Sequence, residues 1–122
     1  MANSTQWEEQ GLQRQFTGII SGDEILRSNL SLQGNEKFDQ LRFIVNDFTD
    51  VTTFELTDRD IAAIASIDNV ASKTNANIRI AIIVKMESLR EWANLYIEKM
   101  QGSTYKCKIF DDVESASLWA KA

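Results

Sequence analysis

The sequence contains no histidine and no proline, and its only cysteine is Cys107. Without histidine the chain cannot build a Ser-His or Cys-His nucleophile pair, an imidazole base or a histidine metal ligand. One cysteine cannot form a disulfide within the chain, and the additional lack of histidine excludes a structural zinc site. Acid–base chemistry would fall to carboxylates, lysine or tyrosine, and a lone thiol fits a reducing compartment.

The signatures of common enzyme classes are also missing. The glycines are isolated from one another, so the chain has neither a GxGxxG nor a GxxxxGKS/T phosphate-binding loop. It also lacks the GxSxG turn that presents a nucleophilic serine. We therefore expect a protein that is not an enzyme, with no catalytic residues, no metal and no cofactor.

Basic residues are few and scattered. The chain has 13 Lys and Arg against 18 Asp and Glu, a formal net charge of −5, whereas binding to a nucleic-acid backbone needs a concentrated basic face. No apolar run approaches the ~18 residues of a membrane-spanning helix, and the polar N-terminal residues lack the basic and apolar regions of a signal peptide. We expect a soluble, cytoplasmic protein with no nucleic-acid partner and no integral membrane segment.

The order of the predicted elements indicates an α/β fold. Short apolar or alternating runs predict strands, and apolar residues at helical spacing behind capping residues predict helices. Their alternation favours a mainly parallel sheet with right-handed crossovers, to which an opening hairpin adds an antiparallel strand. The length of 122 residues and the absence of a linker favour one domain over residues 1–122. The expected strands cover residues 7–18 (a hairpin turning at Gln10-Gly11), 41–45, 78–84 and 105–109, and the expected helices begin near Ser21, Thr57, Ser88 and Asp111 or Asp112.

Two of these helix starts have the spacing of a capping box. Ser21 is followed three residues later by Glu24, and Ser88 is followed in the same way by Glu91. In a capping box the hydroxyl and the carboxylate each accept a hydrogen bond from an N–H group that the helix leaves free. We therefore expect both serines to be N-cap residues.

The densest cluster of acidic and hydroxyl side chains lies in residues 46–58, which we expect to form a loop between a strand and a helix. Ligands of open α/β sheets bind where strands end, so this segment is a candidate contact for a ligand or a regulated partner. Asp47 and Asp50 are a candidate pair for a hard cation such as Mg²⁺. Threonines that satisfy turn and cap hydrogen bonds beside solvated carboxylates produce the same composition, and the sequence favours this second interpretation.

The helix expected after Ser88 has one apolar face, which carries Trp92, Tyr96 and Met100. These side chains line an apolar ligand pocket in one interpretation, and they pack on the sheet in the other. The second interpretation is favoured, because an amphipathic helix in a globular domain usually buries its apolar face.

Cys107 alternates with Lys106 and Lys108 in the last expected strand. Because side chains alternate across a strand, the lysines lie on the face opposite the thiol, where they guard an edge strand. A thiol is reactive when cations nearby lower its pKa, so the pattern favours a buried structural cysteine over a redox thiol.

Three segments carry a family likeness. Residues 16–25 (FTGIISGDEI) read as a strand, a Gly-x-hydrophobic-Ser turn and the start of a helix; residues 43–51 (FIVNDFTDV) read as an apolar strand followed by Asp and Thr; residues 111–119 (DDVESASLW) read as an acidic cap and a closing helix. In order and spacing they resemble the SpoIIAA-like (STAS-like) family of small bacterial proteins, over most of the chain. The resemblance implies a mixed sheet of four or five strands packed with about four helices.

The resemblance also implies a function. Anti-sigma-factor antagonists of the STAS superfamily carry an Asp-Ser-Ser-Gly string at the start of the helix after the central strand, and a partner kinase phosphorylates a serine there to switch partner binding. The corresponding string in this chain is Glu55-Leu56-Thr57-Asp58. The resemblance thus implies a non-enzymatic regulatory or protein-interaction module without the usual phosphoserine motif. Its protein partner would bind a surface formed by Thr53, Glu55, Thr57 and Asp58.

The alternative hypothesis is a carrier of a small apolar ligand or a lipid. The order of elements is remotely similar to that of lipid-carrying α/β proteins, in which a helix closes an apolar cavity. Here the helix expected over residues 88–101 would close it, with Trp92, Tyr96 and Met100 as the lining. A solid core beneath Trp92 and Tyr96 would exclude this hypothesis.

Overall fold

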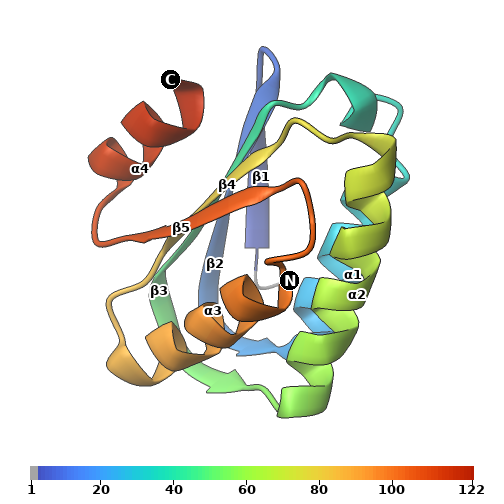
Figure 1. Cartoon of the computed structure of the whole chain (residues 1–122). Coiled ribbons are helices and arrows are strands. Elements are labelled where there is room, and N and C mark those ends of the chain that lie inside the picture. The colour runs from blue at the N-terminus through green and yellow to red at the C-terminus, as the bar shows by residue number, and fades with distance from the viewer. Residues whose placement is uncertain (1–2) are drawn as a thin grey trace.

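The computed structural model describes residues 3–122, which form five strands and four α-helices in the order ββαβαβαβα. The strands lie side by side in the order β1-β2-β3-β4-β5; the first pair is antiparallel and all further pairs are parallel (Figure 1). The predicted α/β class, with a mixed sheet and four helices, is confirmed. The elements are β1 (Asn3–Glu8), β2 (Gly11–Ser21), α1 (Gly22–Gln33), the 3₁₀-helix η1 (Phe38–Gln40), β3 (Phe43–Glu55), α2 (Asp58–Thr74), β4 (Arg79–Ile83), α3 (Glu87–Lys99), β5 (Lys106–Phe110) and α4 (Val113–Lys121).

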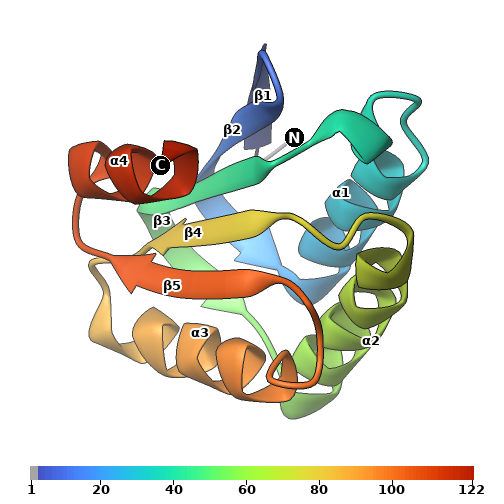
Figure 2. The same cartoon turned by 45° about the horizontal axis from the view of Figure 1, so that its top comes forward.

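Helices cover the two faces of the sheet unequally. Helices α1, α2 and α3 pack on one face, and α4 packs on the other (Figure 2). In β4, Ile80 and Ile82 belong to the large apolar cluster on the first face, whereas Ala81 and Ile83 belong to the smaller cluster beneath α4. A strand that is buried on both faces has a continuous apolar sequence, which explains why this segment does not alternate.

Polar side chains cap the first and last helices as expected. The Ser21 hydroxyl accepts a hydrogen bond from the N–H of Glu24 at 3.2 Å. The Asp112 carboxylate accepts one from the N–H of Ser115 at 2.7 Å. Each bond satisfies a donor that the first helical turn leaves free. None of the helices in residues 3–122 is long and apolar enough to cross a membrane.

Helix α3 begins earlier than predicted. Its N-cap is Met86, whose side chain makes no capping bond, and its first residue is Glu87. Only a short connection separates β4 from α3, and the N–H of Arg90 already bonds to the carbonyl oxygen of Met86 at 3.0 Å. Ser88 and Glu91 therefore lie inside the helix, and the capping box predicted for them is wrong.

Strand β3 occupies most of the segment 46–58, so the loop predicted there is wrong. The strand pairs with β2 in parallel as far as Glu55, which lies opposite Ser21. The register shifts twice, near Gln15 and near Gly18, and each time β3 has one residue more than β2. Such bulges break the strict two-residue alternation by which a strand is recognised in a sequence.

The turn between β1 and β2 lies at Glu9 and Gln10, one residue before the predicted Gln10-Gly11. Gln10 takes the positive φ of 65°, while Gly11 already belongs to β2. The aromatic ring of Phe43 on β3 occupies the space that a Cβ atom on Gly11 would need. Packing against a neighbouring strand, rather than turn geometry, thus requires glycine at position 11.

The substitution Gly11→Ala should lower the free energy of unfolding by about 1–3 kcal/mol, because an added methyl group forces the Phe43 ring out of its packed position. Urea denaturation followed by circular dichroism measures the change. Gly102→Ala is the matched control: nothing lies within 4 Å of a Cβ atom at Gly102, so its effect should stay within about 0.5 kcal/mol. Equal losses in the two variants would contradict this account of Gly11.

Candidate functional site

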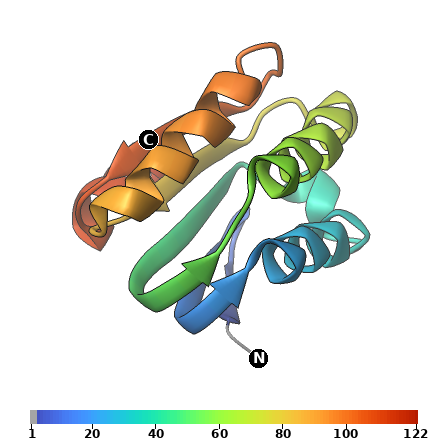
Figure 3. The same cartoon turned by 90° about the horizontal axis from the view of Figure 1, so that it is seen from below.

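The four residues of the predicted partner surface are all exposed. Thr53 and Glu55 lie in the last part of β3 on either side of Phe54, which packs against the core. Thr57 and Asp58 follow at the start of α2. Figure 3 shows that β2 and β3 end next to each other and lead directly into α1 and α2. We call the four exposed residues the β3–α2 edge.

Thr57 is bound into the start of α2 by a complete capping box. Its hydroxyl accepts a hydrogen bond from the N–H of Asp60 at 3.1 Å, and its own N–H donates to the Asp60 carboxylate at 3.0 Å. The Asp60 side chain also fills the space that a Cβ atom on Gly22 would need. The first turns of α1 and α2 are therefore in close contact beside the edge, and the Thr57 hydroxyl already has a structural role.

The candidate cation pair engages in hydrogen bonds along β3. An Asp47 carboxylate oxygen accepts from the N–H of Thr49 at 2.8 Å, and an Asp50 oxygen accepts from the amide of Gln15 at 2.8 Å. Among residues 3–122, no group of three or more His, Cys, Asp or Glu side chains is placed to hold a metal ion.

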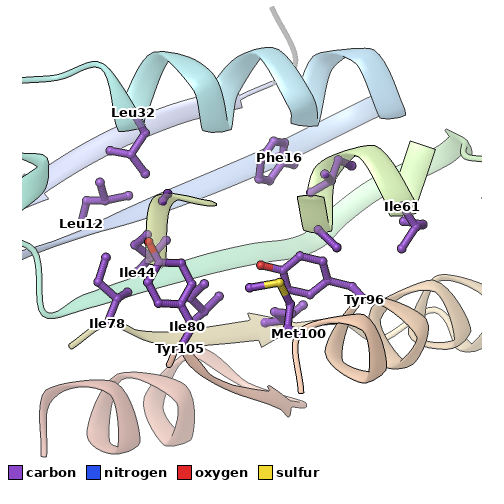
Figure 4. Close-up of a cluster of buried hydrophobic side chains, with 14 of the residues drawn as sticks. Leu12, Phe16, Leu32, Ile44, Ile61, Ile78, Ile80, Tyr96, Met100 and Tyr105 are labelled. Atoms are coloured by element: carbon purple, nitrogen blue, oxygen red, sulfur yellow. The ribbon is translucent and has the colours of Figure 1, made fainter. Parts of the chain in front are cut away.

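A cavity of about 90 Å³ lies between the sheet and helices α1, α2 and α3. Trp92 and Tyr96 line this cavity, and Tyr96 belongs to the apolar core against which Trp92 packs. Met100, which is 2% exposed, belongs to the surrounding core and is not one of the lining residues. Figure 4 shows Tyr96 and Tyr105 pointing inward among the apolar side chains of this core.

A buried polar network crosses one side of the cavity, and it begins at Arg14 on β2. Arg14 is only 4% exposed. It donates to the side-chain oxygens of Asn46 at 2.9 Å, Ser28 at 2.7 Å and Asn29 at 2.7 Å. Its acceptors are neutral, so burial lowers the pKa of Arg14 to about 10, an effect that the charge of Asp68 opposes.

Asp68 on α2 is the other end of the network. Its carboxylate accepts hydrogen bonds from Asn29 at 3.2 Å, Gln33 at 2.7 Å and the Tyr96 hydroxyl at 2.6 Å. Burial raises the pKa of Asp68 above its usual 3.8, although these donors and Arg14 favour the charged form. Asn29 joins the two charged residues by accepting from one and donating to the other.

Tyr105, which precedes β5, differs from Tyr96 in one respect. It is 7% exposed and lines the same cavity, but its hydroxyl has no hydrogen-bond partner among the described residues. A buried hydroxyl without a partner costs about 1–3 kcal/mol relative to one that is hydrogen-bonded. This group is therefore the one polar feature of the cavity that the fold itself leaves unsatisfied in residues 3–122.

Cys107 lies on the same side of β5 as the core, and Lys106 and Lys108 are exposed. Burial, with a further contribution from Asp68, raises the pKa of the Cys107 thiol to about 12. A thiol with a raised pKa is a poor nucleophile, which agrees with the structural role favoured by the sequence.

Solved structures share this fold at low sequence identity. An uncharacterised protein of the DUF3478 family with a SpoIIAA-like fold, from Shewanella loihica PV-4, is 18% identical; the match covers 98% of this chain and 92% of that one, with a TM-score of 0.59. The anti-sigma factor antagonist SpoIIAA in its unphosphorylated form is 8% identical, with 96% and 94% covered and a TM-score of 0.63. Neither a scan against protein-family models nor a search of curated proteins gives a match. The SpoIIAA-like fold expected from the sequence is confirmed.

The two cavity tyrosines should respond differently to loss of the hydroxyl. Tyr96→Phe removes a bond to a carboxylate and should lower the free energy of unfolding by about 1.5–3 kcal/mol. Tyr105→Phe removes a hydroxyl without a partner, so stability should stay within about 0.5 kcal/mol or increase. Urea denaturation of both variants provides the comparison, and a larger loss for Tyr105→Phe would show that the hydrogen bonds are assigned wrongly.

The buried carboxyl of Asp68 should make stability depend on pH. Because its pKa is higher in the folded state than the usual 3.8, the folded protein binds more protons just above that pH than the unfolded chain does. The contribution of Asp68 to the free energy of unfolding is therefore fully present below about pH 4, and it is lost as the pH rises through the raised pKa. Asp68→Asn should remove this part of the pH dependence.

The measurement is the difference in unfolding free energy between the wild type and Asp68→Asn, from pH 4 to pH 8. A difference is needed because Glu8, bonded to Lys121, and Asp112, bonded to Ser115, have lowered pKa values and contribute in the opposite direction. Asp39→Asn, at an exposed site, is the control and should retain the wild-type profile. Parallel profiles for the wild type and Asp68→Asn would overturn the prediction.

Proposed function

We propose that residues 1–122 form one domain that acts in the cytoplasm as a non-enzymatic regulatory or protein-interaction module. The observation that carries the proposal is the β3–α2 edge, at which four polar side chains stand exposed where a central strand meets a helix. The fold supports it, because one solved protein with this fold is an anti-sigma factor antagonist, which is a regulator.

The chemistry of the edge suits a protein partner. Glu55 and Asp58 contribute negative charge, and Phe54 and Leu56, on either side of Glu55 in the chain, pack against the core. An exposed polar surface of this kind has the composition of the rim of a protein interface. We infer that the partner presents a basic surface, because complementary charge speeds association and excludes wrong partners.

The proposed regulation does not use a phosphoserine. The string Glu55-Leu56-Thr57-Asp58 contains no serine, and the Thr57 hydroxyl accepts the capping bond of α2. A phosphate on Thr57 would meet the helix dipole favourably but would crowd the carboxylates of Asp58 and Asp60. Partner binding by the unmodified edge is the simpler proposal.

The alternative of a lipid carrier is less well supported. A cavity is present beneath Trp92 and Tyr96, which keeps a ligand-binding role among the candidates. Its volume of about 90 Å³, however, is well below the ~300–1,000 Å³ of sites for drug-sized ligands. An acyl chain would exceed this volume, so only a much smaller ligand fits.

Site-specific crosslinking in the native cell tests the proposed edge. A photo-crosslinking amino acid in place of Thr53 should capture a protein that the same amino acid in place of Glu36 does not. Glu36 is exposed beyond the far end of α1. Glu55→Lys should reduce recovery of that partner about tenfold, because it places like charge against a basic surface.

The control for that charge reversal is Glu36→Lys, which changes the net charge equally and should leave recovery unchanged. Failure of position 53 to capture a partner, or equal recovery with both charge reversals, would refute the proposed surface.

A further inference from the structure

The cavity beneath α1, α2 and α3 combines apolar walls with one unsatisfied polar group. Its apolar lining comes from the sheet, for example Ile44 and Ile80, and from the helices, for example Ile64 and Leu89. The Tyr105 hydroxyl is buried there without a partner among residues 3–122. A buried polar group in a native structure is normally satisfied by protein, water or ligand, so this hydroxyl marks a place for an additional molecule.

We propose that this cavity binds a small neutral organic molecule whose single hydroxyl or carbonyl oxygen is held by the Tyr105 hydroxyl. The volume of about 90 Å³ is smaller than the ~150 Å³ of an engineered apolar cavity that binds benzene, so a molecule of about two or three carbon atoms fits. A tyrosine hydroxyl both donates and accepts, so it can hold either an alcohol or a ketone oxygen.

The charged groups of the cavity exclude a charged ligand. Arg14 and Asp68 carry opposite charges and are joined through Asn29, which accepts from one and donates to the other. An additional buried carboxylate or ammonium group would lose its hydration, and the attraction of one member of this pair would be offset by the repulsion of the other. The neutral Tyr105 hydroxyl therefore defines the class of ligand.

Partly buried lining residues show where the cavity approaches the surface. Phe48, Leu56 and Trp92 line it and are each partly accessible to solvent, as is Ile25 on α1. The partly accessible lining residues thus come from β3, the β3–α2 connection and helices α1 and α3.

Three-carbon probes test the proposal directly. 1-Propanol added to ¹⁵N-labelled protein should produce saturable shifts of the NMR signals of lining residues, whereas propanoate and propylammonium, which have the same number of carbons, should not. Tyr105→Phe should weaken 1-propanol binding about fivefold, the effect of one hydrogen bond. Saturable binding of either charged probe at equal strength would overturn the proposed ligand class.

Two further variants test the position of the site without changing Tyr105. Ala93→Leu fills the cavity from α3 and should abolish the saturable shifts, while Leu118→Ala, at a residue 71% exposed on α4, should leave them unchanged. Absence of saturable shifts in the wild type, or identical shifts in Ala93→Leu, would refute the site. The test is separate from that of the proposed partner edge, because Glu55→Lys should bind 1-propanol as the wild type does.

Discussion

The parallel pairing of β2 with β3 determines where the other parts of the molecule lie. The strands end opposite each other, with Ser21 facing Glu55, and each continues into a helix. The starts of α1 and α2 are thereby placed side by side (Figure 3). Gly22 permits their contact, because the Asp60 side chain fills the space beside it. A single register thus fixes both the packing of two helices and the position of the exposed edge.

The same strand brings a charge into the core. Arg14 lies between Leu12 and Phe16 on the inner side of β2, and its partners come from α1 and β3. The network continues through Asn29 to Asp68 on α2 and then to the hydroxyl of Tyr96 on α3. Burying two charges is costly. Removing only one of the two charged side chains lowers stability by about 3–5 kcal/mol, because the other charge then stays buried without compensation. The hydrogen bonds of this network require one particular arrangement of α1, α2 and α3. A fully satisfied network of this kind therefore specifies how the three helices pack.

The sequence was sufficient to predict the class of fold, because β4 and the capped helices follow simple patterns. It failed at β3, where bulges remove the alternation, and at the start of α3, where a short connection overrides a local capping pattern. The polar network was missed because its bonds join distant residues. One feature of the sequence points to the network: Asp68 falls at the helical spacing of Ile61, Ile64 and Ala71. In the structure Asp68 is indeed more deeply buried than Ile67. A carboxylate on an apolar face requires a partner, but periodicity cannot identify it.

The β3–α2 connection joins the two proposed sites. Leu56 lines the cavity, whereas its neighbours Glu55 and Thr57 are exposed on the edge. A molecule in the cavity that displaces the backbone of Leu56 would also move the adjoining planar peptide units, which carry these neighbours. The Thr57 capping box limits such movement, since its two hydrogen bonds hold this backbone to α2. Any coupling between partner and ligand would be reciprocal by thermodynamic linkage, and Leu56 is a residue that lies next to both sites.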